Sequence, residues 1–124
     1  MNRPSILVVD DELLIRDLLY DFFTSQGWDI SVAEDGEKAL EMTRAKKFDL
    51  ILADIKMPQM DGLTLSGHVR QSHPSMPIVL MTGFPSVDSA VAALRNRVDD
   101  YVIKPFNINH LYKLLESKLK AGRD

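Results

Sequence analysis

The chain has 124 residues, of which 45% are hydrophobic and 27% are charged. This length and composition can bury one hydrophobic core, so we expect a single domain over residues 1–124. The net charge of -3 argues against direct binding of nucleic acid or of an anionic membrane. No cysteine is present, which excludes disulfides and thiolate metal sites. The first apolar run, residues 6–9, is too short for a signal peptide or a membrane span, so we expect a cytoplasmic protein.

Two kinds of apolar pattern alternate along the chain. Short runs rich in β-branched residues are typical of buried strands, and in chain order they cover residues 5–9, 28–33, 49–53, 78–81 and 100–103. Between and after them, apolar residues recur at helical spacing. In chain order these helices cover residues 14–25, a segment that begins at Gly36, residues 63–71, a segment from Ser86 to about Asn96, and residues 108–119.

Local signals mark several helix ends. The acidic residues 10–12 favour a first helical turn. Gly27 is typical of the position just past a helix C-terminus, and Ser86 is suited to an N-cap. The fivefold alternation of strand and helix predicts an α/β fold with a single five-stranded parallel sheet and five helices flanking its two faces.

Polar side chains follow four of the five predicted strands. The first strand ends at Asp10 and Asp11, and the third ends at Asp54. The fourth strand ends at Thr82, and the fifth ends at Lys104. Ligands of open parallel sheets bind outside the carboxyl ends of the strands, so we expect these side chains to converge. Taken singly, each residue is ordinary at a helix start, in a turn, at a strand end or on a solvated surface. Their coincidence at matching strand ends favours one site.

Three carboxylates held close together repel one another, and a hard divalent cation such as Mg²⁺ relieves that repulsion. Asp54 would then be an ionised nucleophile for a phosphoryl group, with aspartyl phosphate as the product. Lys104 and the hydroxyl of Thr82 would bind phosphate oxygens, because phosphoryl transfer requires mainly positioning and charge neutralisation. The chain has no Gly-rich phosphate loop, so a nucleotide is not the obvious ligand of this site.

With these residues in place, the chain resembles a two-component response regulator receiver domain of the CheY-like, flavodoxin-like superfamily. The resemblance extends from about Ser5 to Leu119. It is carried by Val9-Asp10-Asp11-Glu12, by Asp54-Ile55-Lys56-Met57-Pro58-Gln59-Met60-Asp61-Gly62, by Met81-Thr82-Gly83 and by Asp100-Tyr101-Val102-Ile103-Lys104-Pro105-Phe106. It implies a flavodoxin-like fold with strand order 2-1-3-4-5.

The resemblance also implies roles for single residues. Asp54 would be the phosphoacceptor and a ligand of Mg²⁺. Asp11 would ligate the ion directly, Asp10 directly or through water, and Lys56 through its backbone carbonyl.

The resemblance assigns the phosphate-sensing positions in the same way. Thr82 and Lys104 would contact the phosphate, and Tyr101 would be the aromatic switch residue. The bond between Lys104 and Pro105 would be cis.

A receiver domain is a phosphorylation-activated switch, not an enzyme beyond Mg²⁺-dependent self-phosphorylation and autodephosphorylation. Its donor would be a histidine kinase or a phosphotransfer protein. Its fourth helix, fifth strand and fifth helix would then change their surface to control an output domain or a partner protein. The run from Met81 to Ala93 most resembles receivers that precede transcription-activating or helix-turn-helix modules, and homodimerisation stays open. His68, His73 and His110 are scattered, and we interpret them as surface residues.

The chain departs from the family pattern before its fifth strand. Many members have a Gly-Ala pair where this chain has Arg97-Val98. We expect Asn96 to adopt the left-handed conformation that the glycine usually supplies. The change would alter partner choice on this face. Lys56 and Phe84 lie near the expected path of an attacking water and would tune the phosphate lifetime.

Two rival functions follow from the same residues. A Mg²⁺-dependent phosphatase would use Asp54 as its covalent nucleophile, but such enzymes usually have a second carboxylate two residues later, where this chain has Lys56. A phosphorylation-independent interaction module has no need of the set of Asp11, Asp54, Thr82 and Lys104.

Overall fold

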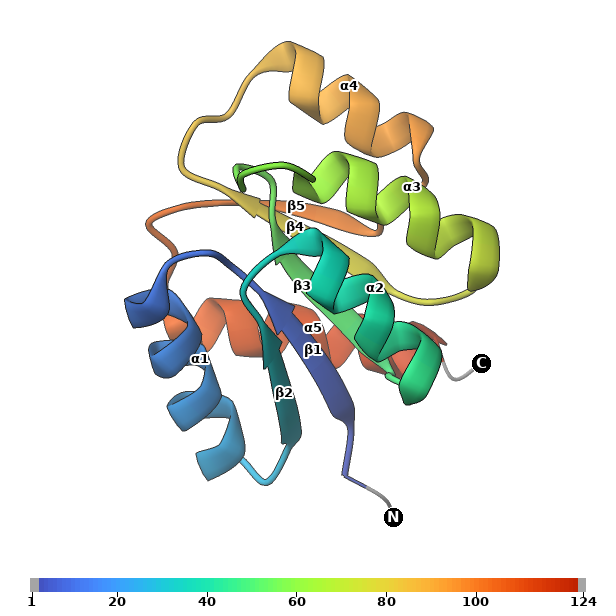
Figure 1. Cartoon of the computed structure of the whole chain (residues 1–124). Helices are drawn as coiled ribbons and strands as arrows, with labels where there is room; N and C mark the ends of the chain where they lie inside the picture. Colours follow the sequence, from blue (N-terminus) through green and yellow to red (C-terminus); the bar gives the residue numbers. More distant parts are fainter. Residues whose placement is uncertain (1–2, 123–124) are drawn as a thin grey trace.

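The computed structural model describes residues 3–122. Its strands form one parallel sheet in the order β2-β1-β3-β4-β5, which confirms the predicted topology (Figure 1). The strands are β1 (Ser5–Val9), β2 (Asp29–Ala33), β3 (Leu50–Asp54), β4 (Ile78–Thr82) and β5 (Asp100–Ile103). The helices are α1 (Leu13–Ser25), α2 (Gly36–Ala45), α3 (Gly62–Ser72), α4 (Val87–Arg95) and α5 (Ile108–Gly122). The predicted boundaries agree with these to within one residue, although α5 continues beyond Leu119.

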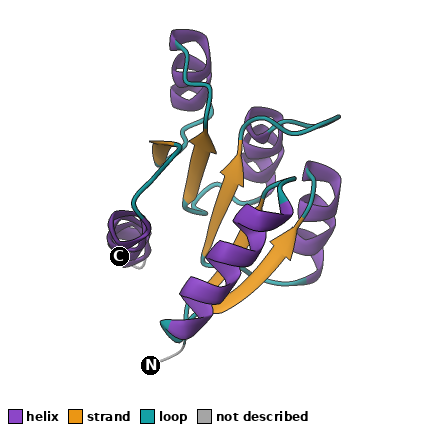
Figure 2. Ribbon diagram, turned by 90° about the vertical axis from the view of Figure 1, so that its left-hand side faces the viewer, coloured by secondary structure: helices purple, strands orange, loops and turns teal. Residues whose placement is uncertain are grey.

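Helices cover both faces of the sheet, as Figure 2 shows in a view turned by 90°. Successive strand side chains point to opposite faces, so each central strand supplies two hydrophobic clusters. In β3, Ile51 and Ala53 pack with residues of α2, α3 and α4, whereas Leu50 and Leu52 pack with residues of α1 and α5. This double coverage explains why β3 is a continuous apolar run that ends in a carboxylate.

Two predicted helix ends are confirmed and one prediction is wrong. Gly27 has φ 87° after α1, and the Ser86 side chain accepts from the backbone N–H of Ser89 at 3.0 Å at the start of α4. Asn96, however, has φ -82°, and the left-handed residue is Arg97, with φ 56°.

The side chain of Asn96 explains this difference. Its Nδ2 donates to the carbonyl of Leu63 at 2.9 Å and contacts Oγ of Ser66 at 3.1 Å. Asn96 therefore fastens the C-terminal end of α4 to α3, and the reversal of the chain falls one residue later.

No helix within residues 3–122 combines the length and the apolar character needed to cross a membrane.

Gly62 fixes the approach of α3 to the end of β3. Its N–H donates to the carbonyl of Ile55 at 2.9 Å, and a Cβ atom at Gly62 would lie 2.3 Å from the carbonyl oxygen of Asp54. Only glycine permits this contact, so the first turn of α3 holds the segment that follows Asp54. Gly67, in the middle of the same helix, has no such constraint, because its added Cβ would meet only Nδ2 of Asn96 at 3.9 Å.

These two glycines form a matched pair for mutation. Gly62→Ala should lower the free energy of unfolding by roughly 2 kcal/mol or more, because the backbone around Asp54 must move. Gly67→Ala should raise it by about 0.5–1 kcal/mol, because alanine is the better helix former and fits without a clash. Urea denaturation of both variants tests this, and equal effects would show that the contact of Gly62 with Asp54 is not limiting.

Candidate functional site

The predicted site residues converge at the carboxyl edge of the sheet. Asp10 follows β1, Asp54 ends β3 and Thr82 ends β4, and their exposed fractions are only 0%, 4% and 1%. Lys104 follows β5 and reaches back over the sheet to the carboxylates. Parallel strands place these four side chains together although they are far apart in the sequence.

Lys104 is the centre of the charge arrangement. Its Nζ lies 2.9 Å from Oδ2 of Asp10, 3.2 Å from Oδ2 of Asp54 and 3.5 Å from Oε1 of Glu12. Two buried carboxylates thus share one partly buried ammonium group, in an interior where each charge is costly unless it is paired.

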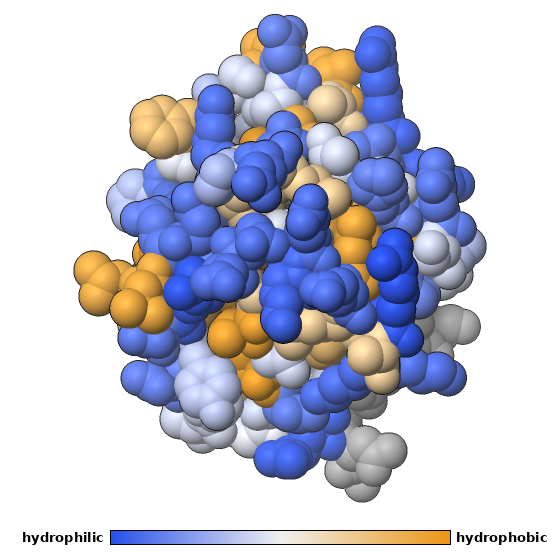
Figure 3. Space-filling view, viewed as in Figure 1, coloured by the Kyte–Doolittle hydropathy of each residue, from blue (hydrophilic) through white to orange (hydrophobic). Residues whose placement is uncertain are grey.

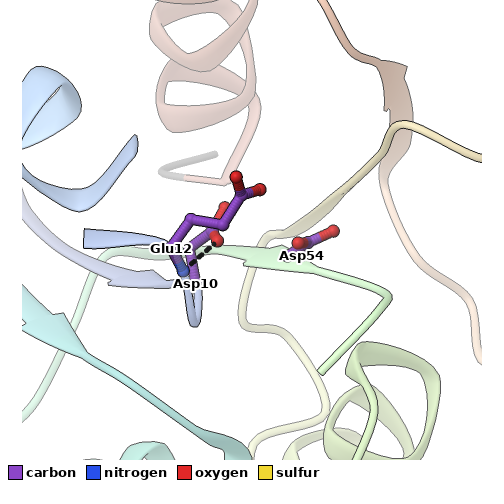
Figure 4. A group of neighbouring side chains, drawn as sticks. All are labelled: Asp10, Glu12 and Asp54. Atoms are coloured by element: carbon purple, nitrogen blue, oxygen red, sulfur yellow. Dashed lines mark hydrogen bonds between the residues drawn. The ribbon is translucent and has the colours of Figure 1, made fainter. Parts of the chain in front are cut away.

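The segment after β1 is held by the backbone and by Arg16. The N–H of Glu12 donates to Oδ1 of Asp10 at 2.9 Å, the bond drawn in Figure 4. The guanidinium of Arg16 donates to the carbonyl of Asp10 at 2.7 Å. These contacts fix the Asp10 carboxylate toward Asp54 and leave Glu12 above it at the mouth of the site.

Three acidic residues have oxygen atoms close enough to share a metal ion. One oxygen each from Asp10, Glu12 and Asp54 lies within 4.8 Å of the others. Oδ1 of Asp54 is buried and accepts no hydrogen bond from residues 3–122. A buried carboxylate oxygen without a partner is costly, so the cluster is compatible with a divalent cation that takes oxygen ligands.

Asp11 and Lys56 lie at the periphery. Both side chains are exposed, and Asp11 is not part of the cluster formed by Asp10, Glu12 and Asp54. Glu12, which the sequence indicates only as part of an acidic helix start, joins the cluster instead. The signal was present, since Glu12 follows directly on Asp10 and Asp11, but sequence alone does not say which of three successive acids turns inward.

Burial shifts the ionisation of the two central groups. It raises the pKa of Asp54, the neighbouring Asp10 carboxylate raises that pKa further, and the Lys104 ammonium offsets only part of the shift. Burial alone would lower the pKa of Lys104, but the hydrogen bond and charge of Asp10, together with Asp54, outweigh it and raise the pKa. Lys104 is therefore firmly cationic, whereas Asp54 is under electrostatic strain.

Thr82 and Tyr101 are both linked to the segment that leads into α4. The hydroxyl of Thr82 accepts from the backbone N–H of Phe84 at 3.0 Å. The hydroxyl of Tyr101 lies 2.6 Å from Oγ of Ser89, and the N–H of Ser86 approaches it at 3.4 Å. Both hydroxyls thus contact the short stretch in which β4 turns into α4.

The other two predicted positions are Phe84 and the peptide bond before Pro105. Phe84 is 73% exposed, and its ring extends from the loop between β4 and α4. The Lys104–Pro105 peptide bond is cis.

A family model for the response regulator receiver domain matches residues 6–116. The chain belongs to this family. The transcriptional regulatory protein ZraR of Salmonella typhimurium is 38% identical over 123 residues, which cover 99% of this chain and 28% of that protein. The DNA-binding transcriptional regulator NtrC of Escherichia coli is 38% identical over 116 residues, which cover 94% of this chain and 25% of that protein. The chain therefore spans about a quarter of the length of these regulators.

Solved structures show the same fold. The CheY-like receiver domain protein of Methanospirillum hungatei matches with a TM-score of 0.96 at 29% identity, over 98% of both chains. The response regulator TrrA of Thermotoga maritima, solved in complex with Mg²⁺-BeF, matches with a TM-score of 0.85 at 35% identity, over 93% of this chain and 98% of that one.

The strain on Asp54 predicts that its removal stabilises the protein. In a buffer with EDTA at pH 7, Asp54→Asn should raise the free energy of unfolding by roughly 1 kcal/mol, because the amide carries no charge to bury and is not repelled by Asp10. The pKa of Asp54 is higher in the folded state than in the unfolded chain, so wild-type stability rises as the pH falls through the folded-state pKa. The advantage of the variant should therefore shrink on acidification and vanish below the unfolded-state pKa.

Urea denaturation between pH 4 and 8 measures this difference. Asp11→Asn, which neutralises an exposed aspartate beside the same site, is the control and should change stability by less than about 0.5 kcal/mol. An Asp54→Asn variant that is less stable than wild type at pH 7 would mean that attraction to Lys104 outweighs burial and repulsion.

Proposed function

We propose that the chain is the phosphorylation-activated switch of a two-component system, with Asp54 as the acceptor of the phosphoryl group. One observation carries this proposal: within residues 3–122 the buried Oδ1 of Asp54 has no hydrogen-bond partner, while Nζ of Lys104 lies 3.2 Å from its Oδ2. One oxygen is thus free to react or to bind a metal, and a fixed cation is ready for the product's charge. The donor is a histidine kinase or a phosphotransfer protein. The P–N bond of its phosphohistidine breaks as the P–O bond to Asp54 forms, and the imidazole leaves.

The acidic cluster fits Mg²⁺, because its donors are carboxylate oxygens and one of them has no hydrogen-bond partner in the described part of the chain. Asp10 and Asp54 would hold the ion, with Asp11, Glu12 and the backbone carbonyl of Lys56 as the further oxygen donors around it. When bound, Mg²⁺ neutralises phosphate oxygens during transfer. The complex of TrrA with Mg²⁺-BeF supports this assignment by relationship.

Lys104 and Thr82 then bind the phosphate oxygens. The ammonium of Lys104 already pairs with Asp54, so it needs little movement to bind a phosphate oxygen on that residue. The hydroxyl of Thr82 can donate to the phosphate and in doing so loosen its bond with Phe84. A shift from mostly inactive to mostly active requires about 5.5 kcal/mol of differential binding, which a dianion with several charge-assisted bonds can supply.

The response passes to α4 through two hydroxyl contacts. Thr82 contacts the N–H of Phe84, and Tyr101 contacts Ser89 in the first turn of α4. Movement of Thr82 toward the phosphate displaces the loop before α4. The Tyr101 hydroxyl then loses its contact with Oγ of Ser89, and the ring changes orientation. The surface formed by α4, β5 and α5 carries this change to the output.

The wider assignment belongs to the same proposal. Residues 1–124 form one receiver domain that acts in the cytoplasm and catalyses only its own phosphorylation and dephosphorylation. Its output is control of transcription, through a longer chain or a partner protein, because ZraR and NtrC are transcriptional regulators.

Intact mass after incubation with Mg²⁺ and a small acyl phosphate tests the acceptor. Wild type should gain one labile phosphate, and both EDTA and Asp54→Asn should abolish the gain. Asp88→Asn removes an exposed acid from the first turn of α4 and should leave the adduct unchanged. An adduct that survives Asp54→Asn would overturn the assignment. Steady turnover of simple phosphate esters by wild type would instead favour a phosphatase.

The link between Tyr101 and Ser89 predicts coupled mutations. Tyr101→Phe and Ser89→Ala should each cost roughly 1 kcal/mol of stability, and the double variant should cost little more than either alone, because both remove the same hydrogen bond. In wild type, beryllofluoride should shift the backbone amide signals of residues 84–90. The absence of any such shift would contradict the proposed route to α4.

A further inference from the structure

A cleft of about 390 Å³ lies between α3 and the C-terminal end of α4, away from the carboxylate site. The residues that line it are Thr64, Gly67, His68, Arg70, Gln71, Arg95, Asn96 and Arg97. None of them is acidic and none has a large apolar side chain. Its size is that of a small-molecule site, and in Figure 3 the surface over α3 and this end of α4 is mostly hydrophilic.

The cleft is positively charged. Arg95 and Arg97 are both exposed, and neither guanidinium forms an ion pair or a hydrogen bond with any of residues 3–122. Asp99, two residues after Arg97, has other partners: its Oδ2 accepts from the N–H of Ile78 at 2.7 Å and from Arg70 at 3.4 Å.

Arg70 places a buried guanidinium against the segment that follows α4. Its side chain is 8% exposed, and its guanidinium donates to the carbonyls of Asn96 at 3.5 Å and Arg97 at 2.9 Å. The buried guanidinium of Arg70 therefore forms part of the cleft wall, and the exposed guanidinium groups of Arg95 and Arg97 lie beside it.

Two residues at the cleft are not the types that the backbone favours at their positions. Arg97 occupies the left-handed region, with φ 56°, where glycine is the ordinary residue. Gly67 interrupts the middle of α3, although its φ is not left-handed and an added Cβ would meet nothing closer than 3.9 Å. The arginine that follows α4 and the glycine that leaves space in α3 both line this cleft.

We propose that this cleft binds a phosphorylated small molecule. The planar guanidinium groups of Arg95 and Arg97 match the geometry of phosphate oxygens, and Thr64 and Gln71 offer further hydrogen-bond donors beside them. Gly67 leaves the floor open for close approach of the ligand. The proposal is independent of the phosphoacceptor role of Asp54.

Binding is tested with inorganic pyrophosphate and ¹⁵N-labelled Asp54→Asn protein in EDTA, so that neither phosphorylation nor a bound metal contributes. Titration should give saturable shifts of the amide signals of residues 64–71 and 95–97. Titration with ADP and with adenosine then separates the sources: tighter binding of ADP indicates a nucleotide, whereas equal binding of ADP and pyrophosphate with none of adenosine indicates the phosphates alone.

Arg97→Gly is the decisive variant, because glycine accepts φ 56° and the fold loses only the side chain. It should weaken pyrophosphate binding about tenfold or more. Lys113→Gln removes the same charge from exposed α5 and should change affinity less than twofold. Gly67→Ala should weaken binding severalfold without loss of stability.

Two results would overturn the proposal. The first is an absence of saturable shifts in these segments for both pyrophosphate and ADP. The second is equal affinity of Arg97→Gly and Lys113→Gln, which would show attraction to overall charge only.

Discussion

The ammonium group of Lys104 lies among the carboxylates of Asp10, Glu12 and Asp54, and two of these carboxylates are buried. Without this cation, two acids at the end of a hydrophobic sheet would repel each other with almost no water to screen them. Loss of the Lys104 ammonium would leave two buried carboxylates without a counter-charge, a change that typically costs about 3–5 kcal/mol. The loops after β1, β3 and β5 are thus held together by the same charges that make the edge reactive.

The sheet makes this arrangement possible. β1 and β3 are covered by helices on both faces, so their backbones are rigid and their ends are placed to within a side chain's reach. Gly62 brings α3 against the carbonyl of Asp54 and prevents the following segment from drifting. Lys104 pairs with Oδ2 of Asp54 and leaves Oδ1 without a partner among residues 3–122. A ligand or a chemical step can use this oxygen.

The helix α4 is held by polar contacts more than by buried apolar side chains. α4 contributes only Ala93 to the buried core, and large apolar side chains such as Val87 and Leu94 are exposed along it. Polar contacts fasten this helix instead: Tyr101 and Ser89 at its beginning, and Asn96 at its end. A helix held mainly by a few hydrogen bonds can be repositioned at small cost, in contrast to the densely packed β3.

The order of strands and helices follows from the sequence alone, because apolar periodicity reports local backbone state and burial. It also placed Asp10, Asp54, Thr82 and Lys104 at strand ends, and parallel topology brings such ends to one edge. Three features required the folded chain: Glu12 joins Asp10 and Asp54, Arg97 and not Asn96 reverses the chain, and Arg70 lies beneath a cationic cleft. Each of these features depends on a contact between side chains and backbone groups of elements that are distant in the sequence. Residue spacing within one strand or helix does not reveal such contacts.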